Sequence, residues 1–125
     1  MRLALAFVFL TAACAALPPA SEEDRMLPFE CDDTVVIGRV VNGAYQHVEN
    51  ENDILGHGWI SATLKVRKVI KRPTLPSKIP VRYFAHTFMR DDRDFMFVLD
   101  HTKTGYEIVT GQLMSARPFL ERSCE

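Results

Sequence analysis

The chain has 125 residues, 47% of them hydrophobic, and its 15 Lys and Arg residues nearly balance its 16 Asp and Glu residues. This length suits one domain with a modest core, and a net charge of −1 creates no global field that would draw the chain to nucleic acid or membranes. Residues 1–16 have the layout of a secretory signal, with Arg2 before an apolar run and a stretch of small residues. We expect cleavage after residue 16, with residue 20 as the alternative, and a secreted or periplasmic protein.

Cys14 gives this segment a second interpretation. Residues 10–14 loosely resemble a bacterial lipoprotein signal, in which the cysteine becomes the lipidated first residue, although Thr11 stands where Leu is usual. A lipid-anchored structural protein of the cell envelope is therefore the alternative. The apolar run is shorter than the ~20 residues that cross a bilayer, so we expect no membrane span.

Cys31 and Cys124 remain after cleavage, and they flank almost all of the β pattern. An exported protein matures in an oxidising compartment, so we expect these two cysteines to form a disulfide. Residues 17–30 are rich in Pro and acidic residues and show no period, which predicts a mobile leader. The folded domain is then expected over residues 31–125.

Five β segments follow in chain order. Residues 34–45 are β-branched and apolar, with Gly38 marking a bend or a close backbone approach. Residues 46–58 are polar and predict a loop, and the next strand alternates from Ile60 until its phase slips at Arg67 and Lys68, which predicts a β-bulge. The remaining strands are expected at 79–88, 95–99 and 106–110, and residues 111–121 look partly helical.

Short turns, a bulge and a central glycine together favour a closed barrel, because closure hides the strand edges. We therefore predict a mainly β fold, a small five-stranded barrel of the OB (oligonucleotide/oligosaccharide-binding) type with a short C-terminal helix. An open meander is the alternative.

Cys31 ahead of the run over residues 34–41, the apolar segment 95–99 and the closing Cys124 together resemble the netrin-module group, which includes the tissue inhibitors of metalloproteinases. The resemblance covers residues 31–124 and implies a cysteine before the first barrel strand paired with one at the domain end. Only six residues, 89–94, separate the third and fourth strands, which leaves no room for the helix of ordinary OB barrels. The inhibitors of this group chelate zinc through an N-terminal cysteine. Here about 14 residues precede Cys31 after cleavage, so that mechanism is not implied.

The sharpest local signal is basic. No acidic residue occurs between Ile54 and Arg90, and a hairpin of the second and third strands would gather cations near its tip, namely Lys65, Arg67, Lys71, Arg72 and Lys78. Such a surface suits an anionic glycan or lipid headgroup. Nucleic acid is a less fitting ligand, because this segment has few aromatic side chains that could stack on bases and because an exported protein is separated from the nucleic acids of the cell. The alternative is an edge strand protected from aggregation by its charges.

No sequence motif indicates catalysis, a metal or a cofactor. The four histidines lack ligand spacing, and neither a Gly-x-Ser-x-Gly elbow nor a His-Glu-x-x-His motif is present. We therefore predict a binding module, not an enzyme, that contacts an unidentified protein partner through loop 46–58, with His57 and Trp59 as the candidate contacts. A polyanion binder that uses the basic hairpin is the competing hypothesis.

Overall fold

The computed structural model describes residues 16–71, 74–121 and 124. The predicted signal peptide and Cys14 lie outside these residues, apart from Ala16, and so does Arg72. The elements in chain order are α1 (Glu22–Arg25), β1 (Met26–Leu27), β2 (Thr34–His47), β3 (Gly58–Lys71), β4 (Lys78–Ala85), β5 (Phe95–Thr102), β6 (Gly105–Leu113), the 3-10 turn η1 (Met114–Ala116) and β7 (Phe119–Leu120).

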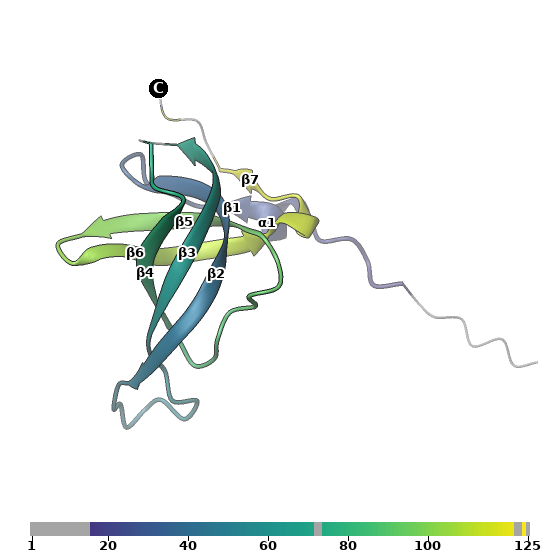
Figure 1. Cartoon of the computed structure of the whole chain (residues 1–125). Helices are drawn as coiled ribbons and strands as arrows, with labels where there is room; N and C mark the ends of the chain where they lie inside the picture. The colour runs from purple at the N-terminus through teal and green to yellow at the C-terminus, as the bar shows by residue number, and fades with distance from the viewer. Residues whose placement is uncertain (1–15, 72–73, 122–123, 125) are drawn as a thin grey trace, which may run out of the picture.

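Strands β2 to β6 form a closed five-stranded barrel, as predicted (Figure 1). Their spatial order is β2-β3-β4-β6-β5, and β5 returns to pair with β2. Four of the five interfaces are antiparallel, and β4 and β6 are parallel, with Val81 opposite Tyr106. The β4–β6 pair closes the sheet, so the open meander is excluded and the fold is an OB-like barrel.

Two local irregularities bend β2 and β3 around the barrel. The β3 residues opposite Ile37 and Gly38 are Lys68 and Val66, so Arg67 is an extra residue, and the predicted bulge is confirmed. A Cβ atom on Gly38 would lie 2.4 Å from the carbonyl oxygen of Lys65, which confirms the close backbone approach. A bulge of this kind increases local twist and supplies the curvature that closure requires.

Alternating apolar residues of the five strands fill the barrel. Val36, Val40, Leu64, Phe97 and Leu99 are each fully buried. Burial of side chains of this size contributes about 1.5–3 kcal/mol each before the entropy cost of folding is counted. Residues that alternate with them along β3 and β4 face solvent and are available for contacts.

A second, smaller core lies between the barrel wall and the N-terminal segment. Leu27 and Phe29 are buried there with Val35, Met96 and Val98, and β1 pairs in parallel with β7. The sequence pattern predicts a mobile leader over residues 17–30, but the last residues of that segment are part of the packed domain. The reason is that two apolar side chains among prolines and acids carry no period, so their burial has no sequence signal.

The disulfide joins Cys31 to Cys124, with 5.6 Å between their Cα atoms. The C-terminal segment that it holds is less helical than expected. Strand β6 continues to Leu113, and one 3-10 turn follows before Arg117 takes a left-handed φ of 55°. Pro118 comes next and cannot continue a helix, because it has no N–H to donate.

Strands β2, β3 and β4 extend beyond the barrel. The pairing of β2 with β5 stops at Gly38, and that of β4 with β6 stops at Arg82, while both strands stay paired with β3. We call this three-stranded projection the arm, residues 42–47, 58–62 and 83–85. The loop of residues 48–57 caps its end and lies at the bottom of Figure 1.

Candidate functional site

A polar clamp holds the segment after β4 against the arm. The hydroxyl of Tyr83 donates to Oδ1 of Asn42 at 2.7 Å and accepts from the backbone N–H of Met89 at 2.9 Å. The side-chain amide of Asn42 then donates to the carbonyl oxygen of Met89 at 2.8 Å. Burial raises the pKa of Tyr83 above its usual value, which keeps the hydroxyl protonated as a donor. The clamp fixes the position of residues that follow the arm.

Asp53 organises the loop at the end of the arm. Its carboxylate accepts hydrogen bonds from the backbone N–H groups of Leu55, Gly56 and His57 at 3.1, 3.1 and 2.7 Å. Nδ1 of His57 lies 2.8 Å from the same carboxylate. These hydrogen bonds, led by that of the His57 side chain, lower the pKa of Asp53 to about 2. Gly56 takes a φ of 73°, which a residue with a side chain rarely adopts, so the loop has a defined turn.

His57 belongs to an aromatic cluster on the outer side of the arm. Its ring stacks on that of Phe84 with 5.6 Å between centroids and meets the ring of His86 edge-on at 5.0 Å. Trp59 also contacts Phe84, at 5.3 Å, and the Arg82 guanidinium lies 4.3 Å above the Trp59 ring. His57 and Trp59, the two residues predicted from the sequence, therefore belong to one cluster because both contact the Phe84 ring.

Phe84 and His86 were not predicted as site residues. Phe84 lies directly opposite Trp59 across β3 and β4, so the pairing register was the signal that could have identified it. That register depends on the loop between the strands, whose geometry the sequence pattern does not provide.

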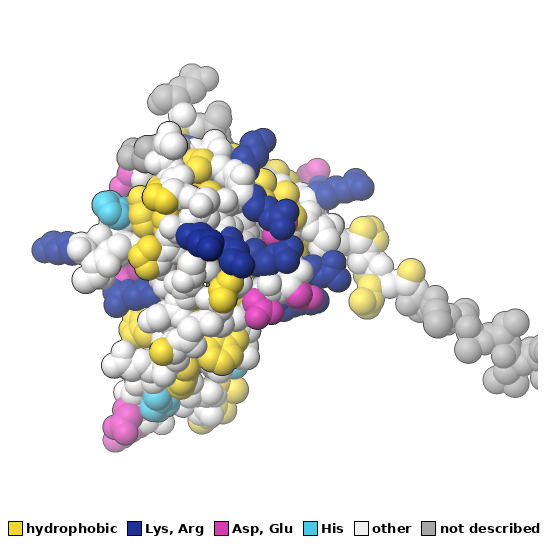
Figure 2. All heavy atoms as spheres, in the orientation of Figure 1, with side chains coloured by type: hydrophobic (Ala, Val, Ile, Leu, Met, Phe, Trp, Pro, Cys, Tyr) yellow, Lys and Arg dark blue, Asp and Glu magenta, His cyan; other side chains and the backbone are white. Residues whose placement is uncertain are grey.

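Large apolar side chains are exposed around the same loop. Ile54 is 95% exposed and Leu55 is 62% exposed, although both are aliphatic. With their exposed neighbours they form what we call the arm-end surface: Tyr45, Ile54, Leu55, Phe84 and Phe88. In Figure 2, patches of hydrophobic side chains and some histidine atoms are visible in the lower part of the molecule, where the arm ends, with acidic side chains at the tip.

Two hollows border this surface. The first, of about 470 Å³, is lined by Tyr45, Leu55, Gly56, Ile60, His86, Thr87 and Phe88. The second, of about 500 Å³, lies on the other side of His57 and includes Phe84 and Asp53 in its lining. Both are open to solvent, so they suit side chains of a docked partner and not an enclosed small substrate.

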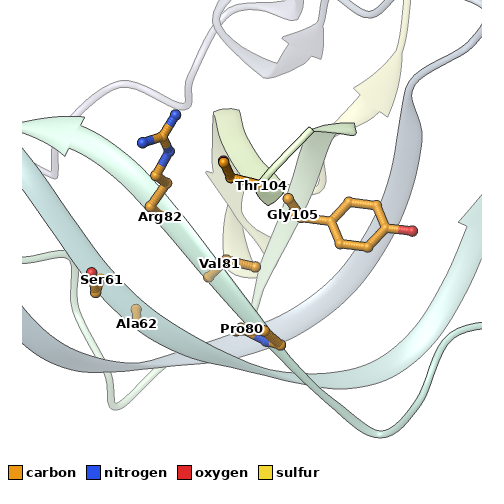
Figure 3. Close-up of a pocket in the computed structure, with 8 residues that line it drawn as sticks. Ser61, Ala62, Pro80, Val81, Arg82, Thr104 and Gly105 are labelled. Atoms are coloured by element: carbon orange, nitrogen blue, oxygen red, sulfur yellow. The ribbon is translucent and has the colours of Figure 1, made fainter. Parts of the chain in front are cut away.

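A third hollow, of about 280 Å³, lies where the arm joins the barrel, between β3, β4 and the β5–β6 turn (Figure 3). Figure 3 shows Arg82 reaching out from β4 on one side and Thr104 and Gly105 on the other. Arg82 forms an ion pair with Glu107 and donates to it from Nε at 2.8 Å. The residues that line this hollow include no nucleophile and base in contact, so they provide no catalytic pair.

Four of the five predicted polyanion contacts lie among the described residues, and they do not form one cluster. Lys65 and Lys78 are exposed and directly opposite each other on β3 and β4. Arg67 pairs with Asp94 at 3.2 Å. Lys71 instead donates to the carbonyl oxygen of Cys31 and lies 5.0 Å above the Phe29 ring, so its ammonium is engaged at the N-terminal segment.

The described part of the chain offers no group of three His, Cys, Asp or Glu side chains placed to hold a metal ion. Within the same residues, no helix has both the length and the apolar character required to cross a bilayer. Comparison with protein-family models, with curated proteins and with solved structures gives no match. The arm and the surfaces beside it are therefore the features that indicate a function.

Proposed function

We propose that this chain is an exported, non-enzymatic binding module that captures a protein partner with its arm-end surface. The exposure of Ile54 and Leu55 on a loop with a defined turn is the observation that carries the proposal. Contiguous apolar side chains of this kind are unfavourable in water unless a partner covers them. A disulfide in the fold agrees with maturation in an oxidising compartment, which supports export.

The geometry suits a protein partner because anchors and polar groups alternate on one surface. Aromatic and aliphatic side chains at the centre of an interface supply most of the binding energy when they enter a partner's pockets. Hydrogen bonds to Asp53 order the loop before binding, so less conformational entropy is lost on association. The exposed Glu49 and Glu51 beside the apolar tip then form a polar rim.

We also propose that the barrel is related to the netrin module. Two features support this: the bridge from Cys31 to Cys124 closes the domain, and no helix occurs among residues 86–94 between β4 and β5. The relation implies no zinc chelation, because residues before Cys31, including the buried Leu27 and Phe29, are part of the packed domain, so Cys31 offers no free α-amine.

The proposal is tested by capture on immobilised protein from extracellular or periplasmic extract of the native host, with the bound proteins quantified by mass spectrometry. We expect Leu55→Ser to lower the recovery of a specific partner at least tenfold, because loss of a central anchor typically costs about 2 kcal/mol or more. His57→Ala and Trp59→Ala should lower it as well, by releasing Asp53 and Phe84 from their contacts.

Val109→Ser is the matched control, since Val109 on β6 is 61% exposed and lies outside the arm. It should capture the partner as well as the unmodified chain does. Equal recovery by Leu55→Ser and Val109→Ser, in proteins with the same melting temperature, would refute the site assignment.

A further inference from the structure

A row of three cations crosses the barrel wall away from the arm-end surface. Lys65 on β3 lies directly opposite Arg39 on β2 and directly opposite Lys78 on β4. Side chains at opposite positions of antiparallel strands have their Cβ atoms about 5 Å apart on the same face of the sheet. We call Arg39, Lys65 and Lys78 the cation row, and Figure 2 shows Lys and Arg side chains gathered on the face that carries β2 and β3.

The row is balanced by nearby acids only at Arg39. Asp94 pairs with Arg39 at 3.1 Å and with Arg67 at 3.2 Å, so one carboxylate serves two guanidinium groups. No ion pair is found for Lys65 or Lys78 among the described residues. Like charges directly opposite each other destabilise a sheet by ~0.2–1 kcal/mol per pair. The repulsion between these cations therefore lowers the stability of the folded state, and the packing of the barrel does not explain why they lie opposite each other.

Protection of a strand edge accounts for the two ends of the row but not for its centre. Arg39 and Lys78 lie where β2 and β4 are each paired only with β3. Lys65 lies in a strand that is bonded on both sides, to β2 and to β4, so there is no free edge at that position. Further positive charge follows along β3, because the bulge residue Arg67 is succeeded directly by the exposed Lys68. A ligand that brings negative charge would offset the repulsion between these cations.

We propose that the cation row binds the sulfate and carboxylate groups of an anionic polysaccharide, at a site separate from the arm-end surface. The five hollows identified among the described residues are lined by residues outside the row, and the row lies on an open surface. A polymer contacts several cations at once and releases several counterions, which gives useful affinity on an open surface.

The flanks of the row favour a linear chain over a planar bilayer. Asp91 is exposed on the segment beside Asp94, whereas Asp92 is paired with Arg90 and Arg93. An anionic membrane laid across the same face would be repelled by Asp91, but a linear chain can follow the row past it. Two exposed aromatic rings that could stack on bases lie away from the row: Phe84 is near the other end of β4, and Phe88 follows that strand. The row therefore lacks the platform that single-stranded nucleic acids require.

The test measures the affinity of the intact, disulfide-bonded protein for fluorescein-labelled heparin across a range of NaCl concentrations. We expect Lys65→Gln and Lys78→Gln each to weaken binding about fivefold and the double variant about 25-fold, as for lysines beside an anionic surface. Lys103→Gln, an equal charge change on the exposed β5–β6 turn, should bind like the unmodified protein. The double variant should also melt at the same temperature or higher, because the like-charge pair is removed.

Three results would overturn the proposal: equal affinity of the double variant and Lys103→Gln, affinity that does not fall with salt, or tighter binding to phosphatidylserine vesicles or duplex DNA than to heparin. The outcome is independent of the arm-end surface. Leu55→Ser should keep full heparin affinity, so loss of one function does not imply loss of the other.

Discussion

The disulfide allows the sharpest prediction about stability. Cys31 and Cys124 are 93 positions apart, so the bridge closes a loop that contains nearly the whole domain. Cross-linking an unfolded chain over about 100 residues removes conformational entropy worth ~4.7 kcal/mol at 25 °C. Domains of this size are stable by only about 5–15 kcal/mol in total. The bridge is therefore expected to supply a third or more of the stability.

The assay is urea unfolding of the unmodified protein and of the Cys31→Ser/Cys124→Ser variant, followed by the fluorescence of Trp59, the single tryptophan. We expect the free energy of unfolding to fall by about 4–5 kcal/mol, with a larger urea dependence because the unfolded variant is more expanded. A fall of less than about 1.5 kcal/mol would refute the reasoning. It would mean that the unfolded variant keeps residual structure that already restrains its ends.

Two further substitutions and one pH titration test the parts that shape the arm. Gly38→Ala should cost about 1–3 kcal/mol in urea unfolding, since a methyl group would lie 2.4 Å from the Lys65 carbonyl oxygen, and a neutral effect would contradict the packing. Asp53 has a lowered pKa in the folded state, so its stabilisation of the loop should be complete above about pH 4 and lost as the pH falls through about 2. Carboxyl NMR titration measures this, and a midpoint near 3.8 would contradict it. Tyr83→Phe should destabilise by ~1–3 kcal/mol and speed hydrogen exchange at the Met89 amide, whereas unchanged exchange would refute the clamp.

The barrel could be predicted because its strands follow simple rules. Alternation along β3 and β4 shows which residues face the core, and the phase slip at Arg67 identifies the bulge that curves the sheet. The core under the N-terminal segment could not be predicted in the same way. Leu27 and Phe29 become buried through pairing of β1 with β7, a contact between the two ends of the chain.

Only part of the candidate site could be predicted, because its contacts also depend on residues that are distant in the sequence. His57 and Trp59 stand out because they lie in and beside a long loop, but their contact with Phe84 depends on the register of β3 and β4. The basic segment shows the same limit. Proximity in the sequence groups Lys71 with Lys65. In the fold, however, Lys71 donates to the carbonyl oxygen of Cys31, and the cation opposite Lys65 is Arg39 of β2.

The central claim, that the arm-end surface contacts a protein partner, is tested most directly by site-specific photo-crosslinking in the native host. A benzophenone amino acid replaces Leu55 in one variant and Val109, exposed on β6, in the other. We predict one discrete crosslinked protein from position 55 and none from position 109. No adduct at position 55, or the same adducts from both positions, would contradict the claim.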